Sequence, residues 1–250
     1  MRETAITFDF HNTLASCDAW FQLEIAELPT AYLAWRAERT GDPAPPGILD
    51  AARAAYRALR REITEHGREL SAERCVATVL QRLDRPVDDA DIAAGVEALM
   101  RATLPDARLL PGAAATVRAL AAAGVPLGIV SSAVYHPFLE WFLAGSGLRD
   151  AFRVVTTSAS AGYYKSRPEI YAAALAALDV PADRAVHVGD SYRWDVQGAQ
   201  RAGMRTVWIG ADGASGGPTA ADGPSPDLVL ANLEQAAPPL LALLGRTVAP

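Results

Sequence analysis

From Pro111 onward the sequence alternates short apolar runs with helical patterns, and this alternation constrains the fold more than any other feature. The runs predict strands over residues 125–130, 153–156, 184–188, 204–209 and 227–230. Helical patterns occupy residues 112–123, 135–144, 168–178, 192–202 and 233–244. Strands that alternate with helices of about 10–15 residues predict a parallel, doubly wound sheet with helices on both faces.

The N-terminal 107 residues have a different pattern. The segment ETAITFD, residues 3–9, predicts one further buried strand, because β-branched and aromatic side chains follow one another closely. Residues 16–107 show no strand pattern and predict helices over 20–40, 48–66, 72–83 and 88–103. The predicted fold is therefore α/β: a Rossmann-like doubly wound sheet core, residues 1–15 and 108–250, with an inserted all-helical cap domain, residues 16–107. The stretch 212–226, rich in Gly, Pro, Ala and Ser, is predicted to be a surface loop.

Composition excludes several classes of protein. The net charge is −6 and no basic tract is concentrated on one element, which argues against nucleic acid as a partner. No apolar run has the length of a membrane span, and residues 1–10 do not resemble a signal peptide, so a soluble, cytoplasmic protein is expected. The two cysteines, Cys17 and Cys75, lack the spacing of a zinc or redox site and are predicted to be core thiols.

Polar side chains follow the predicted strands at the points where the strands end. Asp9, with His11 and Asn12 behind it, follows the first strand, and Ser131-Ser132 follows the second. Lys165 lies in the loop after the third strand. Asp190, with Asp195 five residues beyond, follows the fourth. Because the carboxyl ends of parallel strands meet at one edge of a sheet, these groups are expected to converge there.

Lys165 is the only lysine in the chain, whereas the other 22 of the 23 basic residues are arginine. It precedes a predicted helix, where a compact ammonium group could reach a bound anion. Lysine and arginine are not interchangeable in a tight anion site, because one is a point charge and the other a planar fork. The position and the residue type together indicate a functional role.

The predicted cluster has a specific chemistry. Three crowded carboxylates, Asp9, Asp190 and Asp195, repel one another, and a bound divalent cation relieves that repulsion. Hard oxygen ligands that leave room for phosphate and water suit Mg²⁺. Lys165, Ser131 and backbone N–H groups after Asp9 could then hold a phosphoryl group while the Asp9 carboxylate attacks it.

This arrangement resembles the haloacid dehalogenase superfamily over essentially the whole predicted core. Asp9 to Thr13 resembles the motif DxDxT at its first and last positions, Ser131 resembles the second motif, Lys165 with Pro168 the third, and Gly189-Asp190 with Asp195 the fourth. The resemblance implies a hydrolase with a cap that opens and closes, and Mg²⁺ held by the Asp9 carboxylate, the His11 backbone carbonyl and Asp190, with Asp195 nearby or bridged through water. It also implies catalytic roles for Asp9, His11, Ser131 and Lys165. Substrate contacts are assigned to Ser131, Ser132, Lys165 and Asn12.

Two departures from the family pattern stand out. Phosphatases of the family have a second aspartate, the general acid–base, where this chain has His11. An imidazole can do this work near neutral pH, although a nearby Mg²⁺ and Lys165 would favour its neutral form. In addition, Lys165 is not followed by the proline and aspartate that are frequent in the family.

Three readings of function remain open. A Mg²⁺-dependent phosphatase that acts on a small phosphate ester accounts for all four motifs. A 2-haloacid dehalogenase, in which Asp9 attacks carbon, normally lacks the Gly-Asp carboxylate that Gly189-Asp190 supplies. A binding module that lost activity through His11 would not need the nucleophile, the lysine and the acids that remain. A phosphonatase requires a cap lysine, and residues 16–107 contain none.

The remaining histidines and the aromatic residues of the predicted cap are expected to be structural. His66 and His136 are predicted to lie on helix surfaces, and His187 inside a strand, so none is assigned to catalysis. A set of aromatic residues recurs at helical spacing, which predicts a core face: Trp20, Phe21, Tyr32 and Trp35.

Overall fold

The computed structural model describes residues 3–210 and 223–245. Its centre is a six-stranded sheet in the order β5-β4-β1-β6-β7-β8, in which every neighbouring pair is parallel. The strands are β1 (Ala5–Phe8), β4 (Leu127–Ser131), β5 (Val154–Thr157), β6 (Ala185–Gly189), β7 (Arg205–Ile209) and β8 (Leu228–Leu230). The predicted doubly wound α/β fold is therefore confirmed.

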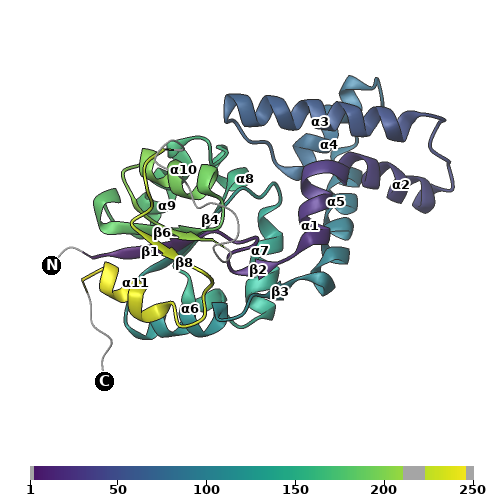
Figure 1. Ribbon diagram of the computed structural model, residues 1–250. Coiled ribbons are helices and arrows are strands. Elements are labelled where there is room, and N and C mark those ends of the chain that lie inside the picture. Colours follow the sequence, from purple (N-terminus) through teal and green to yellow (C-terminus); the bar gives the residue numbers. More distant parts are fainter. Residues whose placement is uncertain (1–2, 211–222, 246–250) are drawn as a thin grey trace.

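Helices cover both faces of the sheet. Helices α9 (Pro168–Leu178) and α10 (Gln197–Arg201) pack on one face, and α6 (Ala113–Ala122), α7 (His136–Gly145) and α11 (Ala237–Leu243) on the other (Figure 1). With both faces covered, all four residues of β1 and all five of β4 and of β6 are buried. This burial explains why the central strands read as continuous apolar runs.

The predicted cap segment is helical and lies beyond the carboxyl ends of the strands (Figure 1). It contains α1 (Asp18–Gln22), the π-helical turn η1 (Leu23–Glu27), α2 (Leu28–Thr40), α3 (Ile48–His66), α4 (Ala72–Arg82) and α5 (Asp89–Thr103). The amphipathic α3 has the predicted bounds, and Ser71 begins α4 by accepting a hydrogen bond from the Arg74 N–H at 3.4 Å. Cys17 and Cys75 are buried free thiols, as expected.

One expectation for this segment was wrong. The helix predicted over residues 20–40 is interrupted by η1, because an extra residue is accommodated in a wider π turn. At the borders of the segment, β2 (Ala15–Ser16) pairs antiparallel with β3 (Arg108–Leu109), a pairing that was not predicted and of which only Ser16 lies within residues 16–107. These short strands lie where the chain enters and leaves the helical segment, and their apolar patterns are too short to read from the sequence.

Smaller differences concern the α/β part. The helix predicted over 192–202 begins as the π turn η5 (Tyr192–Val196), and the helix predicted from residue 233 begins at Ala237. Short elements that were not predicted are α8 (Ser158–Ala161) and the 3₁₀ turns η2 (Leu104–Asp106), η3 (Arg149–Ala151) and η4 (Ala182–Arg184). The predicted loop 212–226 lies, up to residue 222, outside the described residues. Among the described helices, none is both long and apolar enough to cross a membrane.

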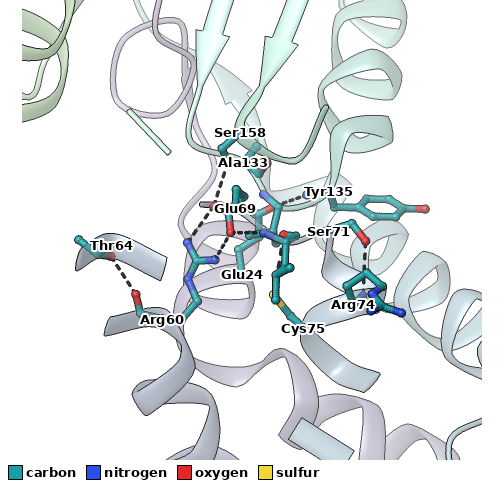
Figure 2. A network of polar contacts seen from close by, with 12 residues as sticks. Glu24, Arg60, Thr64, Glu69, Ser71, Arg74, Cys75, Ala133, Tyr135 and Ser158 are labelled. Atoms are coloured by element: carbon teal, nitrogen blue, oxygen red, sulfur yellow. Dashed lines mark hydrogen bonds and ion pairs between the residues drawn. The ribbon is translucent and has the colours of Figure 1, made fainter. Parts of the chain in front are cut away.

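A buried polar network joins the helical segment to the sheet core (Figure 2). The Arg60 guanidinium contacts the Glu69 carboxylate at 2.7 Å, and Glu69 accepts a hydrogen bond from the Ser158 hydroxyl at 2.9 Å. Glu24 accepts from the backbone N–H groups of Val134 and Tyr135 at 3.1 and 3.0 Å. Both carboxylates are buried and paired, so the two parts meet through specific contacts rather than by apolar packing alone.

Candidate functional site

The end of β1 delivers the first acidic side chain to the sheet edge. The Asp9 N–H donates to the Val188 carbonyl at 2.8 Å, which continues the pairing of β1 with β6 beyond the last strand residue. The Asp9 side chain is only 11% exposed. Asp190 directly follows β6, the strand that pairs with β1. The parallel register of these two strands therefore brings the carboxylates of Asp9 and Asp190 to one edge of the sheet.

Lys165 lies between two of the acids. Its Nζ is 2.5 Å from Asp9 Oδ1 and 2.6 Å from Asp195 Oδ1. The lysine side chain is 3% exposed and that of Asp195 is 1% exposed. The single lysine of the chain is thus placed in the acidic cluster that the strand-end pattern predicts.

Asp195 is positioned by the π turn η5 and by a glycine. Its Oδ2 accepts a hydrogen bond from the Ser191 N–H at 2.9 Å, and Ser191 Oγ in turn accepts from the Trp194 N–H at 3.3 Å. A Cβ atom on Gly189 would lie 2.3 Å from Asp195 Cγ. The close approach of the Asp195 side chain to the end of β6 therefore requires glycine at position 189.

The three acids form one group whose ligand atoms lie within 4.8 Å of one another: Asp9, Asp190 and Asp195. Burial, assisted by the neighbouring carboxylates, raises the pKa of Asp9 and of Asp190. Burial also opposes ionisation of Asp195, but the Lys165 ammonium and the His187 hydrogen bond together outweigh it and lower the pKa of Asp195. Three carboxyl groups thus share one ammonium group, so this buried site holds more acidic groups than cations.

The predicted phosphate-binding groups lie around the same cavity. Ser131, the last residue of β4, is buried there, and the half-buried Ser132 lies beside it in the cavity lining. Asn12 adopts a left-handed backbone conformation with φ of 60° and lies at the cavity rim. Thr13 is buried, and its hydroxyl donates to Asp190 Oδ1 at 3.4 Å. The turn after Asp9 therefore supports the Asp190 carboxylate and contributes to the cavity lining.

His11 turns toward the helical segment rather than toward the acids. Its Nε2 is 3.2 Å from Asp18 Oδ1, and its ring stacks on Phe21 with 4.3 Å between centroids and an interplanar angle of 11°. A carboxylate only accepts, so Nε2 carries the hydrogen of this contact. The imidazole still lines the cavity.

His187 is a residue whose contact with the site the sequence did not reveal. It is fully buried in β6, with Nε2 3.2 Å from Asp195 Oδ1 and Nδ1 2.8 Å from the Thr7 hydroxyl. The Asp195 carboxylate requires a hydrogen on Nε2, so the Thr7 hydroxyl donates to Nδ1. Burial lowers the pKa of His187, which keeps the ring neutral and suited to this bridging position. His66 is exposed, as predicted, whereas His136 is half-buried against the Thr157 hydroxyl at 3.2 Å.

The cavity has a volume of about 230 Å³ and a lining of two chemical kinds. The acids, Lys165 and the two serines supply polar side chains. Four aromatic rings, which we call the aromatic wall, supply much of the rest: Trp20, Phe21, Tyr164 and Trp194. Trp20 belongs to the buried core, as predicted, and Phe21 packs partly buried against that core. Both also line the cavity, which helical spacing alone does not reveal.

Comparisons with known proteins find relatives among hydrolases. The family model of haloacid dehalogenase-like hydrolases matches residues 3–203. Glyceraldehyde 3-phosphate phosphatase of Pyrococcus abyssi is 33% identical over 156 residues, which are 62% of this chain and 64% of that protein. The match thus spans less than two thirds of that relative.

Solved structures of both phosphatases and dehalogenases resemble the chain. A 2-haloacid dehalogenase from Pseudomonas syringae has a TM-score of 0.69 and 25% identity, with 97% of this chain and 99% of that chain covered. A phosphatase from Thermococcus onnurineus has a TM-score of 0.60 and 23% identity, with both chains fully covered. With the family model matched over most of the sequence, the chain belongs to the haloacid dehalogenase-like hydrolases.

Proposed function

We propose that the protein is a Mg²⁺-dependent phosphatase that acts on a small phosphate ester through an aspartyl-phosphate on Asp9. The observation that carries this proposal is the cluster of Asp9, Asp190 and Asp195 within 4.8 Å, with Lys165 between Asp9 and Asp195. The phosphatase relative supports the same reaction class. We further propose that residues 16–107 act as a cap over a core of residues 1–15 and 108–250.

The donor set fits a divalent cation. Three carboxylates and one ammonium leave two uncompensated negative charges when all are ionised, and all the side-chain donors are hard oxygens. Asp9, Asp190 and the His11 carbonyl would hold Mg²⁺, with Asp195 beside them. When bound, the ion neutralises the acids and polarises the phosphoryl oxygens.

In the proposed reaction, an Asp9 carboxylate oxygen forms a bond to phosphorus while the bond from phosphorus to the ester oxygen breaks. Lys165 and Ser131 hold the non-bridging oxygens, with further contacts from Ser132 and Asn12, and they stabilise the charge that is spread over them in the transition state. Water then attacks the phosphorus of the aspartyl-phosphate, which releases inorganic phosphate and restores the Asp9 carboxylate.

We assign the proton transfers to His11. Its ring lines the cavity that holds the acids, and the Asp18 contact at 3.2 Å fixes its orientation. His11 would give a proton to the departing ester oxygen and later take one from the attacking water. It replaces the aspartate that the family pattern has at this position.

The identity of the leaving group tests this role. Because a general acid contributes roughly 10²–10⁴ in rate when the leaving group is poor, His11→Ala should cost far more on an alkyl phosphate than on 4-nitrophenyl phosphate. The measurement is kcat/KM for both esters in the wild type and in His11→Ala, with His11→Asp as the variant that restores a family-type acid. Equal losses on the two esters would make His11 a packing or substrate-contact residue.

A second candidate function is dehalogenation, in which the Asp9 carboxylate would displace halide from carbon. It is favoured by the likeness to the 2-haloacid dehalogenase structure. That chemistry needs no metal, so it leaves the acidic cluster without a purpose.

Metal removal separates the two candidates. With 4-nitrophenyl phosphate, EDTA should reduce kcat by roughly 10²-fold or more, because the Lewis acid is lost and the carboxylates are left to repel the phosphoryl group. Added Mg²⁺ should restore the rate. Activity on 2-chloropropionate that EDTA leaves unchanged, without phosphatase activity, would instead assign the dehalogenase reaction.

A further inference from the structure

We propose that the aromatic wall of the cavity binds a small, uncharged leaving group through a hydrogen bond from the Trp20 indole N–H to an oxygen of that group. The inference rests on the proposed phosphatase function and names its substrate class. That class is phosphate esters of small neutral polar alcohols, with discrimination against leaving groups that carry a carboxylate or a second phosphate.

The first observation concerns Trp20. Its ring lines the cavity and is 1% exposed, stacked on Phe138 with 4.7 Å between centroids and at the edge of Phe10 at 5.9 Å. Its indole nitrogen is buried and has no hydrogen-bond partner among the described residues. Buried donors are rarely left unpaired, because the lost hydration is not replaced. Because the Trp20 ring lines the cavity, a substrate oxygen that reached this N–H would supply the missing partner.

The second observation is the charge around the cavity. No arginine is among the described lining residues, and the ammonium of Lys165 is already shared by Asp9 and Asp195. Two arginines contact rings of the aromatic wall without lining the cavity themselves: Arg60 contacts the Tyr164 ring and pairs with Glu69, and Arg193 lies over the Trp194 ring. A second anionic group on the substrate would therefore be desolvated against the aromatic wall, where no arginine or further lysine of the described lining can pair with it.

The third observation is that the aromatic wall is held in place. Trp20 and Phe21 belong to α1, which continues directly into η1, and Glu24 of η1 accepts hydrogen bonds from Val134 and Tyr135 of the core (Figure 2). This contact ties the wall to the loop that follows Ser131 and Ser132. The binding surface for the leaving group is thus preformed, which reduces the entropy lost on binding.

Size completes the assignment. The cavity of about 230 Å³ is smaller than the range of roughly 300–1,000 Å³ that is usual for drug-sized ligands, and it must also hold the phosphoryl group. The space that remains suits a leaving group of a few carbon atoms. A nucleoside or a longer sugar would extend beyond the cavity.

Three phosphate esters with the same three-carbon skeleton test the proposal: glycerol 3-phosphate, n-propyl phosphate and 3-phosphoglycerate. Each is measured as a competitive inhibitor of 4-nitrophenyl phosphate turnover with Mg²⁺, so the assay does not require that the ester itself be hydrolysed. In the wild type, 3-phosphoglycerate should bind at least about tenfold more weakly than glycerol 3-phosphate, because its carboxylate is left unpaired. Propyl phosphate should also bind more weakly, since it offers no oxygen to Trp20.

The substitution Trp20→Phe removes the N–H and keeps an aromatic ring. It should weaken glycerol 3-phosphate binding by roughly three- to tenfold and change propyl phosphate binding by less than about twofold. Trp35→Phe, in α2 and away from the cavity lining, is the matched control and should change neither. A uniform loss on both esters in Trp20→Phe would show a packing defect and overturn the proposal, as would equally tight binding of 3-phosphoglycerate. Failure of the wild type to hydrolyse 4-nitrophenyl phosphate would instead contradict the proposed function on which the inference rests.

Discussion

Replacing Asp9 by asparagine is expected to reduce kcat on 4-nitrophenyl phosphate by roughly 10⁴-fold or more, which is the usual fall in kcat when an enzyme loses its nucleophile. The amide oxygen is a far weaker nucleophile than the carboxylate, and no other group at the end of β1 replaces it. Asp183→Asn, an exposed change in η4 at the opposite end of β6, is the matched control and should leave kcat unchanged.

The Asp9→Asn variant should not lose stability in metal-free buffer at neutral pH. Burial raises the pKa of Asp9 above its unfolded value, so the folded state favours the protonated form. Stability that depends on this proton is present at low pH and is lost as pH rises through the folded pKa. Asparagine is neutral at every pH, so its thermal midpoint by circular dichroism should equal or exceed that of the wild type. Retained activity would end the covalent mechanism, and a collapsed spectrum would make Asp9 a structural residue.

Lys165→Arg is expected to lower kcat/KM by roughly 10²–10³, the effect of removing a fixed charge that stabilises a transition state. The ammonium lies 2.5 Å from Asp9 and 2.6 Å from Asp195 in a site where the side chain is 3% exposed. A planar guanidinium is bulkier and would displace Asp195, which also holds His187 and the Ser191 N–H.

The control for this substitution is the reverse exchange on the surface. Arg153 pairs with Glu3 at 2.9 Å, and its side chain is 53% exposed, so Arg153→Lys should change kcat/KM by less than about twofold. Kinetics of both variants on the same aryl phosphate give the comparison. Near-normal kinetics for Lys165→Arg would mean that the one lysine of the chain has no specific function.

The sequence predicts the core fold and the placement of the acids because both follow from one rule. Parallel strands end at the same edge, so residues that follow buried runs must meet there, and Asp9, Asp190 and Lys165 do lie together. The bounds of α3 and α9 follow from apolar periodicity and from clear breakers at their ends.

Other features depend on contacts between distant residues and leave little local signal. The sequence places His187 inside a strand, but its hydrogen bond to Asp195 depends on how far the π turn η5 brings that side chain back. Trp20 has the spacing of a core residue whether its ring packs on protein or faces a cavity. The pairing of β2 with β3 joins segments more than 90 residues apart through two residues each.

The central claim is a covalent phosphoryl group on Asp9, and the stereochemical course at phosphorus tests it without requiring the intermediate to accumulate. The substrate is a thiophosphate ester made chiral with heavy oxygen and hydrolysed in isotopically distinct water. Two successive in-line displacements, first by Asp9 and then by water, each invert the configuration. The account predicts overall retention, whereas inversion would show direct attack by water and contradict it.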